Sequence, residues 1–203
     1  MEVKDRIQEK ALEMFMRYGI RSVSMDEIAG QLGMSKKTLY QHFVDKDELI
    51  EAVVADDVSK GEQDCLNSCQ MAGNAIEEVF ILMQSVLKQI REMNPVVIYD
   101  LQKFHPKAFR HFEKHKNEFI LSMVKQNMER GIKEELYRED ISIDILSRYR
   151  LESMFIPFNM DVFPPSKYEV ASVTREVMVH FTFGIATSKG HKLIQKYLKE
   201  FSI

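Results

Sequence analysis

A short stretch of the chain, residues 33–43 (GMSKKTLYQHF), gathers side chains that suit contact with a charged partner. Two lysines, a threonine, a tyrosine, a glutamine and a histidine lie there, and Leu39 and Phe43 are the apolar anchors. Because these two residues are four apart, they form one narrow buried stripe on a helix and leave most of its surface polar. We expect that a molecule outside the chain contacts this surface.

Local signals predict the helices that position this stretch. Apolar residues at helical spacing predict a first helix over residues 3–18, and Gly19 follows as its end. Ser24 and Glu27 have the spacing of a capping box and open a short second helix. The third helix is expected to begin after an N-cap at Ser35. A helix, a glycine turn and a second helix are the parts of a helix-turn-helix, in which the second helix lies in the major groove of DNA.

The chain beyond this region is also expected to be helical. A capping-box spacing at Asp45 and Glu48 opens a fourth helix. Pro95 and Pro106 mark two further helix starts, because the first turn of a helix tolerates proline. We expect Gly131 at another helix boundary.

The C-terminal part is predicted to hold helices over residues 142–158 and 167–189. Within the second of these, apolar residues alternate over residues 177–185, which also suits a strand. No turn signal is present to return a hairpin, so we favour a helix. The predicted fold class is therefore all α. It divides into an N-terminal three-helix helix-turn-helix DNA-binding domain, residues 1–47, and a C-terminal helical bundle, residues 48–203.

The charge balance restricts the kind of binding surface that we expect. The formal net charge is -3 and the sequence pI is about 6.1, which is less basic than a chain dominated by nucleic-acid contact. Two lysines and no acids lie between Ile28 and Val44, so the positive field is local. No apolar run resembles a secretory signal or a membrane span, and we expect the protein to stay in the cytoplasm.

Residues 22–50, SVSMDEIAGQLGMSKKTLYQHFVDKDELI, resemble the N-terminal DNA-binding region of the tetracycline-repressor (TetR) family of bacterial transcriptional regulators. Together with the helix before it, this resemblance covers about a quarter of the chain. The matching positions are Ala29, Gly33, Ser35, Thr38, Leu39, Tyr40, Phe43 and Lys46. The remainder is similar to the family only in its length and its helical character.

The resemblance implies a ligand-responsive transcriptional regulator, with repression as the expected mode. It also implies that a homodimer binds a palindromic operator of double-stranded DNA. The residues that it assigns to DNA phosphate are Thr38, Tyr40, His42 and Lys46, and those that it assigns to bases are Lys36, Lys37 and Gln41. Lysine suits the N7 and O6 acceptors of guanine.

The C-terminal bundle is expected to bind a small-molecule effector and to form the dimer. Methionines and phenylalanines concentrate after residue 70, and a cavity between helices is a usual place for a ligand. The candidate effector-binding residues are Phe80, Met83, Phe104, Phe119, Met123, Met154 and Phe155. The candidate dimer-interface residues are Val170, Val173, Val177 and Phe181, on a helix with more apolar surface than one internal face needs.

A rival interpretation uses histidines as metal ligands in an α-helical metal protein or enzyme. His111 and His115 are four apart and would face the same way on a helix, with His105 as a third ligand. No cysteine or aspartate cluster completes the set, and no catalytic motif with its required context is found, so we expect neither an enzyme nor a cofactor. A helix-turn-helix that contacts protein instead of DNA is a third possibility.

Overall fold

The structure is a computed structural model that describes residues 2–201. Regular structure in this range is helical, apart from one isolated antiparallel β-bridge between Tyr137 and Ala186, and the predicted all-α class is confirmed. Among the helices of this range, none has the length and the apolar content needed to span a lipid bilayer. The chain forms two compact units: Met1–Gly61 with Glu92–His115, and Glu62–Arg91 with Lys116–Ile203.

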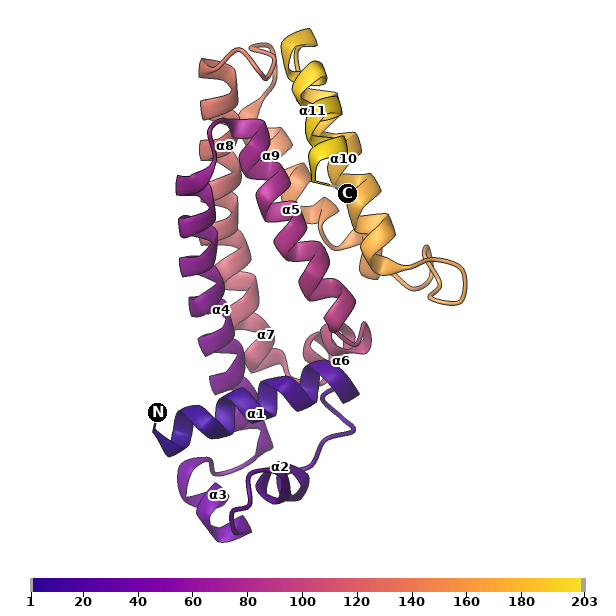
Figure 1. Cartoon of the computed structure of the whole chain (residues 1–203). Helices are drawn as coiled ribbons and strands as arrows, with labels where there is room; N and C mark the ends of the chain where they lie inside the picture. Colours follow the sequence, from indigo (N-terminus) through magenta and orange to yellow (C-terminus); the bar gives the residue numbers. More distant parts are fainter. Residues whose placement is uncertain (1, 202–203) are drawn as a thin grey trace. The chain divides into compact units, whose positions relative to one another are not determined.

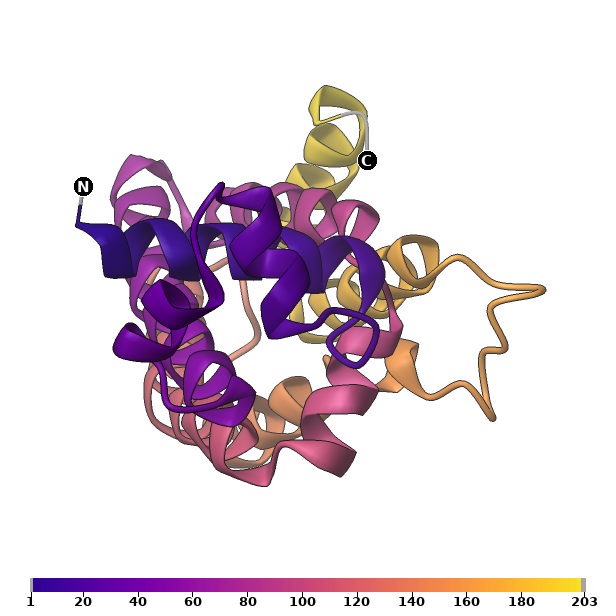
Figure 2. The same ribbon diagram turned by 90° about the horizontal axis from the view of Figure 1, so that it is seen from below.

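The first unit contains the predicted helix-turn-helix. Its helices are α1 (Val3–Tyr18), α2 (Met25–Gln31), α3 (Lys36–His42), the first part of α4 (Lys46–Met71), α6 (Val96–Phe104) and α7 (Pro106–His115). In Figure 1, α2 and α3 lie on the same side of α1, and Figure 2 shows these indigo and purple helices from below. The predicted bounds of the first helix and the helix starts at the two prolines are confirmed.

Each helix of the first unit contributes to one apolar core. Ile7 of α1, Ile28 of α2 and Leu39 of α3 are fully buried. Leu49 of α4 and Val97 of α6, which come later in the chain, are buried in the same core. The short helix α3 is therefore held by a few apolar side chains, and the rest of its surface is free for other contacts.

The second unit is a helical bundle. Its elements are the end of α4, α5 (Ala75–Glu92), the π-helix η1 (Lys116–Ile120), α8 (Leu121–Lys133), α9 (Ile143–Ser153), the 3-10 helix η2 (Ile156–Phe158), α10 (Val170–Ile185) and α11 (Ser188–Glu200). α8 packs along α9, and η2 packs against α10. The long loop between η2 and α10 extends away from the helices of this unit (Figure 1).

The two units do not coincide with the predicted division after residue 47. The helix α4 starts at Lys46 and continues through that point, so it supplies residues to both units. The first unit also takes α6 and α7, which are far away in the sequence. The division into a DNA-binding part, residues 1–47, and a part for effector binding and dimerisation, residues 48–203, therefore stays a prediction.

Two C-terminal helices end earlier than the sequence predicts. α9 ends at Ser153, and α10 spans only Val170–Ile185 although a helix was expected to residue 189. α10 ends because Ala186 is extended and pairs with Tyr137, with flanking backbone hydrogen bonds of 2.9 Å. The Thr187 hydroxyl then accepts a hydrogen bond from the backbone N–H three residues later and opens α11. The helical interpretation of residues 177–185 is confirmed.

Gly131 has a different role from the predicted helix boundary. It lies inside α8, where an added Cβ would stand only 2.0 Å from a ring carbon of Tyr137. The backbone N–H groups of Leu136 and Tyr137 both donate to the Gly131 carbonyl, at 2.8 and 3.0 Å. A glycine is needed here because the Tyr137 ring packs directly on the helix backbone.

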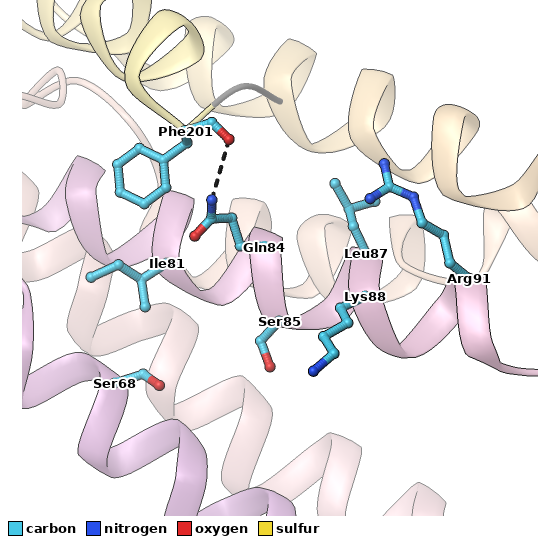
Figure 3. A pocket seen from close by; sticks show the side chains of 8 residues that line it. All are labelled: Ser68, Ile81, Gln84, Ser85, Leu87, Lys88, Arg91 and Phe201. Carbon is cyan, nitrogen blue, oxygen red and sulfur yellow. Dashed lines mark hydrogen bonds between the residues drawn. The ribbon is translucent and has the colours of Figure 1, made fainter.

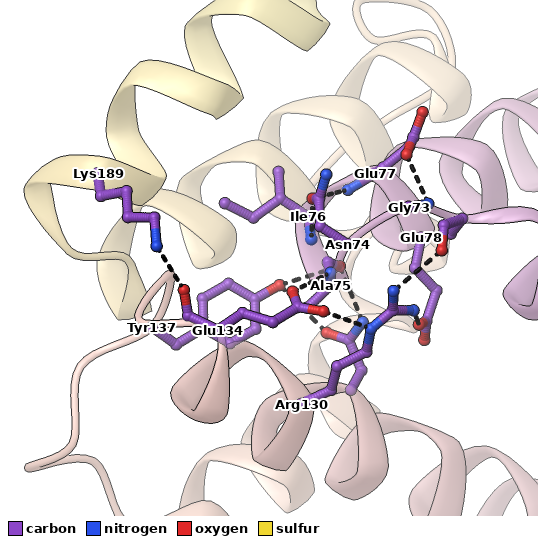
Figure 4. Close-up of polar contacts among 12 residues, drawn as sticks. Gly73, Asn74, Ala75, Ile76, Glu77, Glu78, Arg130, Glu134, Tyr137 and Lys189 are labelled. Carbon is purple, nitrogen blue, oxygen red and sulfur yellow. Dashed lines mark hydrogen bonds and ion pairs between the residues drawn. The ribbon is translucent and has the colours of Figure 1, made fainter.

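A partly buried polar network joins the turn between α4 and α5 to the end of α8 (Figure 4). Arg130 donates to Glu134 at 2.7 Å, to Glu78 at 3.1 Å and to the Ala72 carbonyl at 2.9 Å. Glu134 in turn accepts from the Ala75 N–H at 2.8 Å. The buried carboxylate of Glu78 is thus paired with a cation, as is usual for a charge in a protein interior.

Candidate nucleic-acid interface

Local hydrogen bonds fix the starts of α2 and α3. The Ser24 hydroxyl accepts from the Glu27 backbone N–H at 3.2 Å, and the Glu27 carboxylate accepts from the Ser24 backbone N–H at 2.7 Å, which confirms the capping box. The bond from the Ser24 backbone N–H, and after it a bond of 2.8 Å that the Ser24 hydroxyl donates to the same carboxylate, lower the pKa of the Glu27 carboxyl group. At the start of α3, the Ser35 hydroxyl accepts from the Thr38 N–H at 3.1 Å, as an N-cap does.

A glycine turn joins the two helices. Gly33 has a φ of 65°, in the left-handed region that favours glycine. The following Met34 N–H donates to the Ala29 carbonyl at 3.0 Å and closes the turn. Ala29 is buried, and its small side chain permits the close packing of α2. The turn therefore fixes the direction in which α3 leaves α2.

The surface of α3 is as the sequence predicts. Leu39 and Phe43 are buried, whereas Lys37, Tyr40 and Gln41 are exposed, with 48 % of the Tyr40 surface accessible. In the described part of the chain, these three exposed side chains have no hydrogen bond or ion pair of their own. They are available to a partner without the loss of an existing bond.

Three other candidate DNA-binding residues of α3 have intramolecular contacts or partial burial. Lys36 forms an ion pair with Asp26 of α2, and both side chains are more than half exposed. Such a pair contributes at most about 1 kcal/mol, so a phosphate can replace the carboxylate. The Thr38 hydroxyl lies 2.8 Å from the Ser35 hydroxyl, and His42 is half-buried at the end of the helix.

Lys46 differs most from its expected role. Its ammonium group donates to the Ile20 carbonyl at 2.6 Å and lies 5.9 Å from the centre of the Phe15 ring. Partial burial lowers the pKa of Lys46, and the carboxylates of Asp100 and Asp47 oppose that shift. The side chain thus ties the start of α4 to the loop between α1 and α2, and a phosphate contact would compete with this bond.

Sequence reasoning missed a set of contacts that orders the same loop. The buried carboxylate of Asp100 accepts from the Arg21 backbone N–H at 3.3 Å. The Arg21 guanidinium lies 4.5 Å from the centre of the Phe104 ring, which is a cation–π distance. Because Asp100 and Phe104 are about 80 residues away in the chain, no local pattern could reveal this pairing. The only signal in the sequence was a basic residue, Arg21, next to the predicted helix-turn-helix.

The histidines do not form the metal site of the rival interpretation. His105, between α6 and α7, lies 2.8 Å from the Asp47 carboxylate of α4, and His111 of α7 lies 3.0 Å from the Glu51 carboxylate of α4, so each already has a carboxylate partner. Within residues 2–201, no group of three His, Cys, Asp or Glu side chains is placed to hold a metal ion. His115, at the end of α7, is not brought into a ligand set with the other two. The metal interpretation is therefore not carried further.

The candidate effector-binding residues are divided between the two units. Phe80 and Met83 are fully buried in the apolar core of the second unit, where Phe80 packs against Tyr197. Phe104 belongs to the first unit and packs under Arg21. The other four, Phe119, Met123, Met154 and Phe155, are half-buried in the second unit, around the helices η1, α8 and α9.

A separate groove of about 450 Å³ lies in the second unit (Figure 3). Ile81 and Leu87 of α5 supply apolar walls, and Lys88 and Arg91 stand at one end. The Gln84 amide donates to the Phe201 carbonyl at 3.2 Å across the groove. None of the seven candidate effector-binding residues lines it, so this surface was not predicted from the sequence.

The candidate dimer residues lie on a partly apolar face. Val170, Val177 and Phe181 are half-buried on α10, and Val173 is buried. On α9, Ile145 and Tyr149 are 66 % and 53 % exposed, one helical turn apart. The rings of Tyr149 and Phe181 are 6.0 Å apart, so the exposed residues of α9 continue the face that α10 begins.

Known proteins match this chain most clearly at its N-terminus. The family model described as bacterial regulatory proteins, tetR family, matches residues 7–53. An HTH-type transcriptional regulator of Staphylococcus aureus is 39 % identical over 59 residues, which is 29 % of this chain and 32 % of that protein. The matched region thus spans about a third of the length of that curated relative.

Solved structures match nearly the whole fold at low sequence identity. A transcriptional regulator from Saccharomonospora viridis in complex with choline has a TM-score of 0.75 at 16 % identity, over 91 % of this chain and 97 % of that chain. The regulator FadR from Bacillus subtilis in complex with stearoyl-CoA has a TM-score of 0.66 at 13 % identity, over 89 % and 98 %. These likenesses establish the fold. The N-terminal helix-turn-helix of this chain, residues 7–53, is therefore that of the tetR family of bacterial regulatory proteins.

Proposed function

We propose that the protein is a transcriptional regulator that binds a palindromic DNA operator as a homodimer and responds to a small-molecule effector. The observation that carries the proposal is the surface of α3. Its apolar stripe is buried, while Lys37, Tyr40 and Gln41 are exposed next to a glycine turn. This is the arrangement in which a recognition helix presents polar side chains to the major groove.

The residues of α3 have distinct expected roles. Lys37 and Gln41 are exposed and reach base edges, and lysine suits guanine. Tyr40, Thr38 and His42 contact phosphates and set the register of the helix on the duplex. Lys36 joins the base-reading set when it leaves its exposed pair with Asp26. Lys46 supports this surface through Ile20 and reaches phosphate only when that bond opens.

Dimerisation supplies the affinity that a helix of seven residues lacks. Two such helices, about 34–36 Å apart, fit successive major grooves on one side of the duplex. The face formed by α9 and α10 is the proposed interface, because Ile145 and Tyr149 expose apolar surface next to Phe181. Burial of such a face is a usual driving force for a twofold dimer.

The effector is proposed to act from the second unit and to release the operator, which makes the protein a repressor. The structural neighbours were solved with choline and with stearoyl-CoA, so this fold accepts ligands of very different size and charge. By linkage, an effector weakens DNA binding by the same free energy by which DNA weakens effector binding. α4 supplies residues to both units and is the proposed path of this coupling.

Selection of bound sequences from a random DNA pool tests the proposal. We expect enrichment of a palindrome whose half-site spacing matches two major grooves. Lys37→Ala and Gln41→Ala are expected to change the enriched sequence, whereas Lys60→Ala, an exposed and ion-paired control on α4, leaves it unchanged. Uniform weakening by the first two variants would contradict base reading. No retention of DNA even at low salt would contradict the proposed function.

A further inference from the structure

Arg150 on α9 places a positive charge in the interior of the second unit. The residue is only 7 % exposed. Its guanidinium has one weak hydrogen bond, to the Ser153 hydroxyl at 3.4 Å, and lies 5.7 Å from the centre of the Phe181 ring. Within residues 2–201, no carboxylate lies within ion-pair distance of it.

The lack of a carboxylate partner separates Arg150 from the other buried charges. Glu78 is paired with Arg130 at 3.1 Å, and Asp100 accepts a backbone hydrogen bond. Burial alone lowers the pKa of Arg150 to about 10, so the group remains protonated at neutral pH. A buried charge without a counter-ion is costly for the fold, which indicates that something other than folding requires it.

The polar groups around Arg150 limit what its partner can be. The Ser153 hydroxyl donates to the Arg150 carbonyl at 2.7 Å, and the buried Ser147 hydroxyl donates to the Asp144 carbonyl at 3.2 Å. Both hydroxyl groups therefore already donate to backbone carbonyls, and the guanidinium is the strong donor that remains available to a partner. A group that accepts hydrogen bonds and carries negative charge fits this donor best.

The aromatic ring beside Arg150 indicates the rest of that partner. The Phe181 ring faces the guanidinium, with its centre 5.7 Å away. A second cation close to α9, Lys116, is already paired with Glu152 of α9 at 3.0 Å. One cation without a carboxylate partner, beside an aromatic ring, suits a single anionic head group with an apolar body.

We propose that Arg150 is the charge anchor for an organic anion, a carboxylate or a phosphate monoester with an apolar body, and that this anion is the effector. Only the role of this anion as the effector rests on the proposed function. The planar guanidinium matches the oxygen geometry of both head groups and forms paired hydrogen bonds with either. The apolar body packs against Phe181.

The test uses the full-length protein with decanoate, decyl phosphate and, as a neutral probe, 1-decanol. Calorimetric titration gives the affinity, and thermal unfolding gives the midpoint. Arg150→Met removes the charge and keeps an unbranched apolar side chain. Arg148→Met is the matched control, because Arg148 is on the same helix, is 64 % exposed at its side chain and pairs with Asp144 at 3.5 Å.

We expect one or both anions to bind wild type and Arg148→Met alike, and to bind Arg150→Met at least about tenfold more weakly, since a charged hydrogen bond is lost. The anion that binds more tightly identifies the head group. Without ligand, we expect Arg150→Met to raise the unfolding midpoint, because it removes an unpaired buried charge. Arg150→Lys, which keeps the charge, is expected to retain part of the anion affinity.

Several results would overturn the proposal. Binding of 1-decanol as tight as that of the anions, or equal anion affinity in Arg150→Met, would show that the charge is not used. A lowered midpoint in Arg150→Met with no anion binding to wild type would make Arg150 a structural residue. Loss of the dimer in Arg150→Met would point to a carboxylate of a second copy as its partner instead.

DNA retention separates this proposal from the proposed function. If the protein binds the selected operator but no anion depends on Arg150, the anchor is wrong and the regulator stands. If anions bind through Arg150 but no DNA is retained, the anchor stands and the regulator is wrong. If the anion releases the operator from wild type but not from Arg150→Met, the result would support both the anchor and the regulator.

Discussion

Replacement of Gly131 by alanine tests the packing of the second unit directly. In an ordinary helix interior, this change stabilises by about 1 kcal/mol, because alanine has the higher helix propensity. Here an added Cβ would stand 2.0, 2.3 and 2.7 Å from three ring atoms of Tyr137. Such contacts are too short to persist, so the ring has to move.

The ring of Tyr137 has little room to move. It is 1 % exposed, and its hydroxyl donates to the Asn127 side chain at 3.1 Å. Overpacking of a core costs typically about 1–3 kcal/mol. Loss of the buried hydrogen bond adds roughly 1 kcal/mol, which offsets the gain in helix propensity. We therefore expect Gly131→Ala to lower the free energy of unfolding by about 1–3 kcal/mol.

Gly61→Ala is the matched control, because Gly61 is exposed within α4 and an added Cβ there would meet no atom within 4 Å. It is expected to stabilise by up to about 1 kcal/mol. Urea unfolding followed by circular dichroism measures both, and each kcal/mol shifts the thermal midpoint by roughly 2–4 °C. If Gly131→Ala stabilises as Gly61→Ala does, the close packing of Tyr137 on α8 is wrong.

Three further substitutions test other parts of the structure. Ser24→Ala is expected to cost about 1 kcal/mol of stability, because it removes the N-cap hydroxyl. It is also expected to raise the pKa of Glu27 part of the way toward its ordinary value, measured by carboxyl-carbon NMR, because the hydroxyl bond is lost and the backbone bond stays. Since the folded pKa is lowered, the contribution of Glu27 is present above its ordinary pKa and is lost as the pH falls through the folded value. An unchanged pKa would refute the contribution of the Ser24 hydroxyl. Lys46→Ala is expected to weaken binding to all DNA sequences about equally. It is also expected to reduce the slope of log affinity against log salt concentration by roughly one unit. An unchanged slope would show that Lys46 does not contact phosphate and only binds the loop before α2. Phe181→Glu is expected to give a monomer in sedimentation analysis, and a persistent dimer would place the interface elsewhere.

Local signals in the sequence were enough to predict the first unit's main helices. Gly19, the Ser24–Glu27 pair and Ser35 act through hydrogen bonds within four residues, so their effect does not depend on the rest of the fold. The same holds for the narrow apolar stripe of α3. The exposed side chains of the candidate DNA site could therefore be identified before any tertiary contact was known.

Contacts between distant segments explain what the sequence could not reveal. The end of α10 depends on the pairing of Ala186 with Tyr137, about 50 residues earlier. The bond from Lys46 to Ile20 forms only when the start of α4 lies beside the loop after α1. Arg150 looks like any surface arginine in the sequence, and only the packing of α9 shows that it is buried with no carboxylate from residues 2–201 beside it.

Phe181 connects the two proposed features of the second unit. Its ring lies 6.0 Å from the Tyr149 ring at the proposed dimer face and 5.7 Å from the guanidinium of Arg150. An anion bound to Arg150 would pair with the charge that now lies against the Phe181 ring. The preferred position of that ring would therefore depend on whether an anion is bound. Because the same ring lies at the proposed dimer face, anion binding and the geometry of the proposed dimer would be linked, and each would alter the other by the same free energy. In the proposed dimer, the distance between the two α3 helices would decide whether both reach the operator, and it is therefore where this linkage would affect DNA binding.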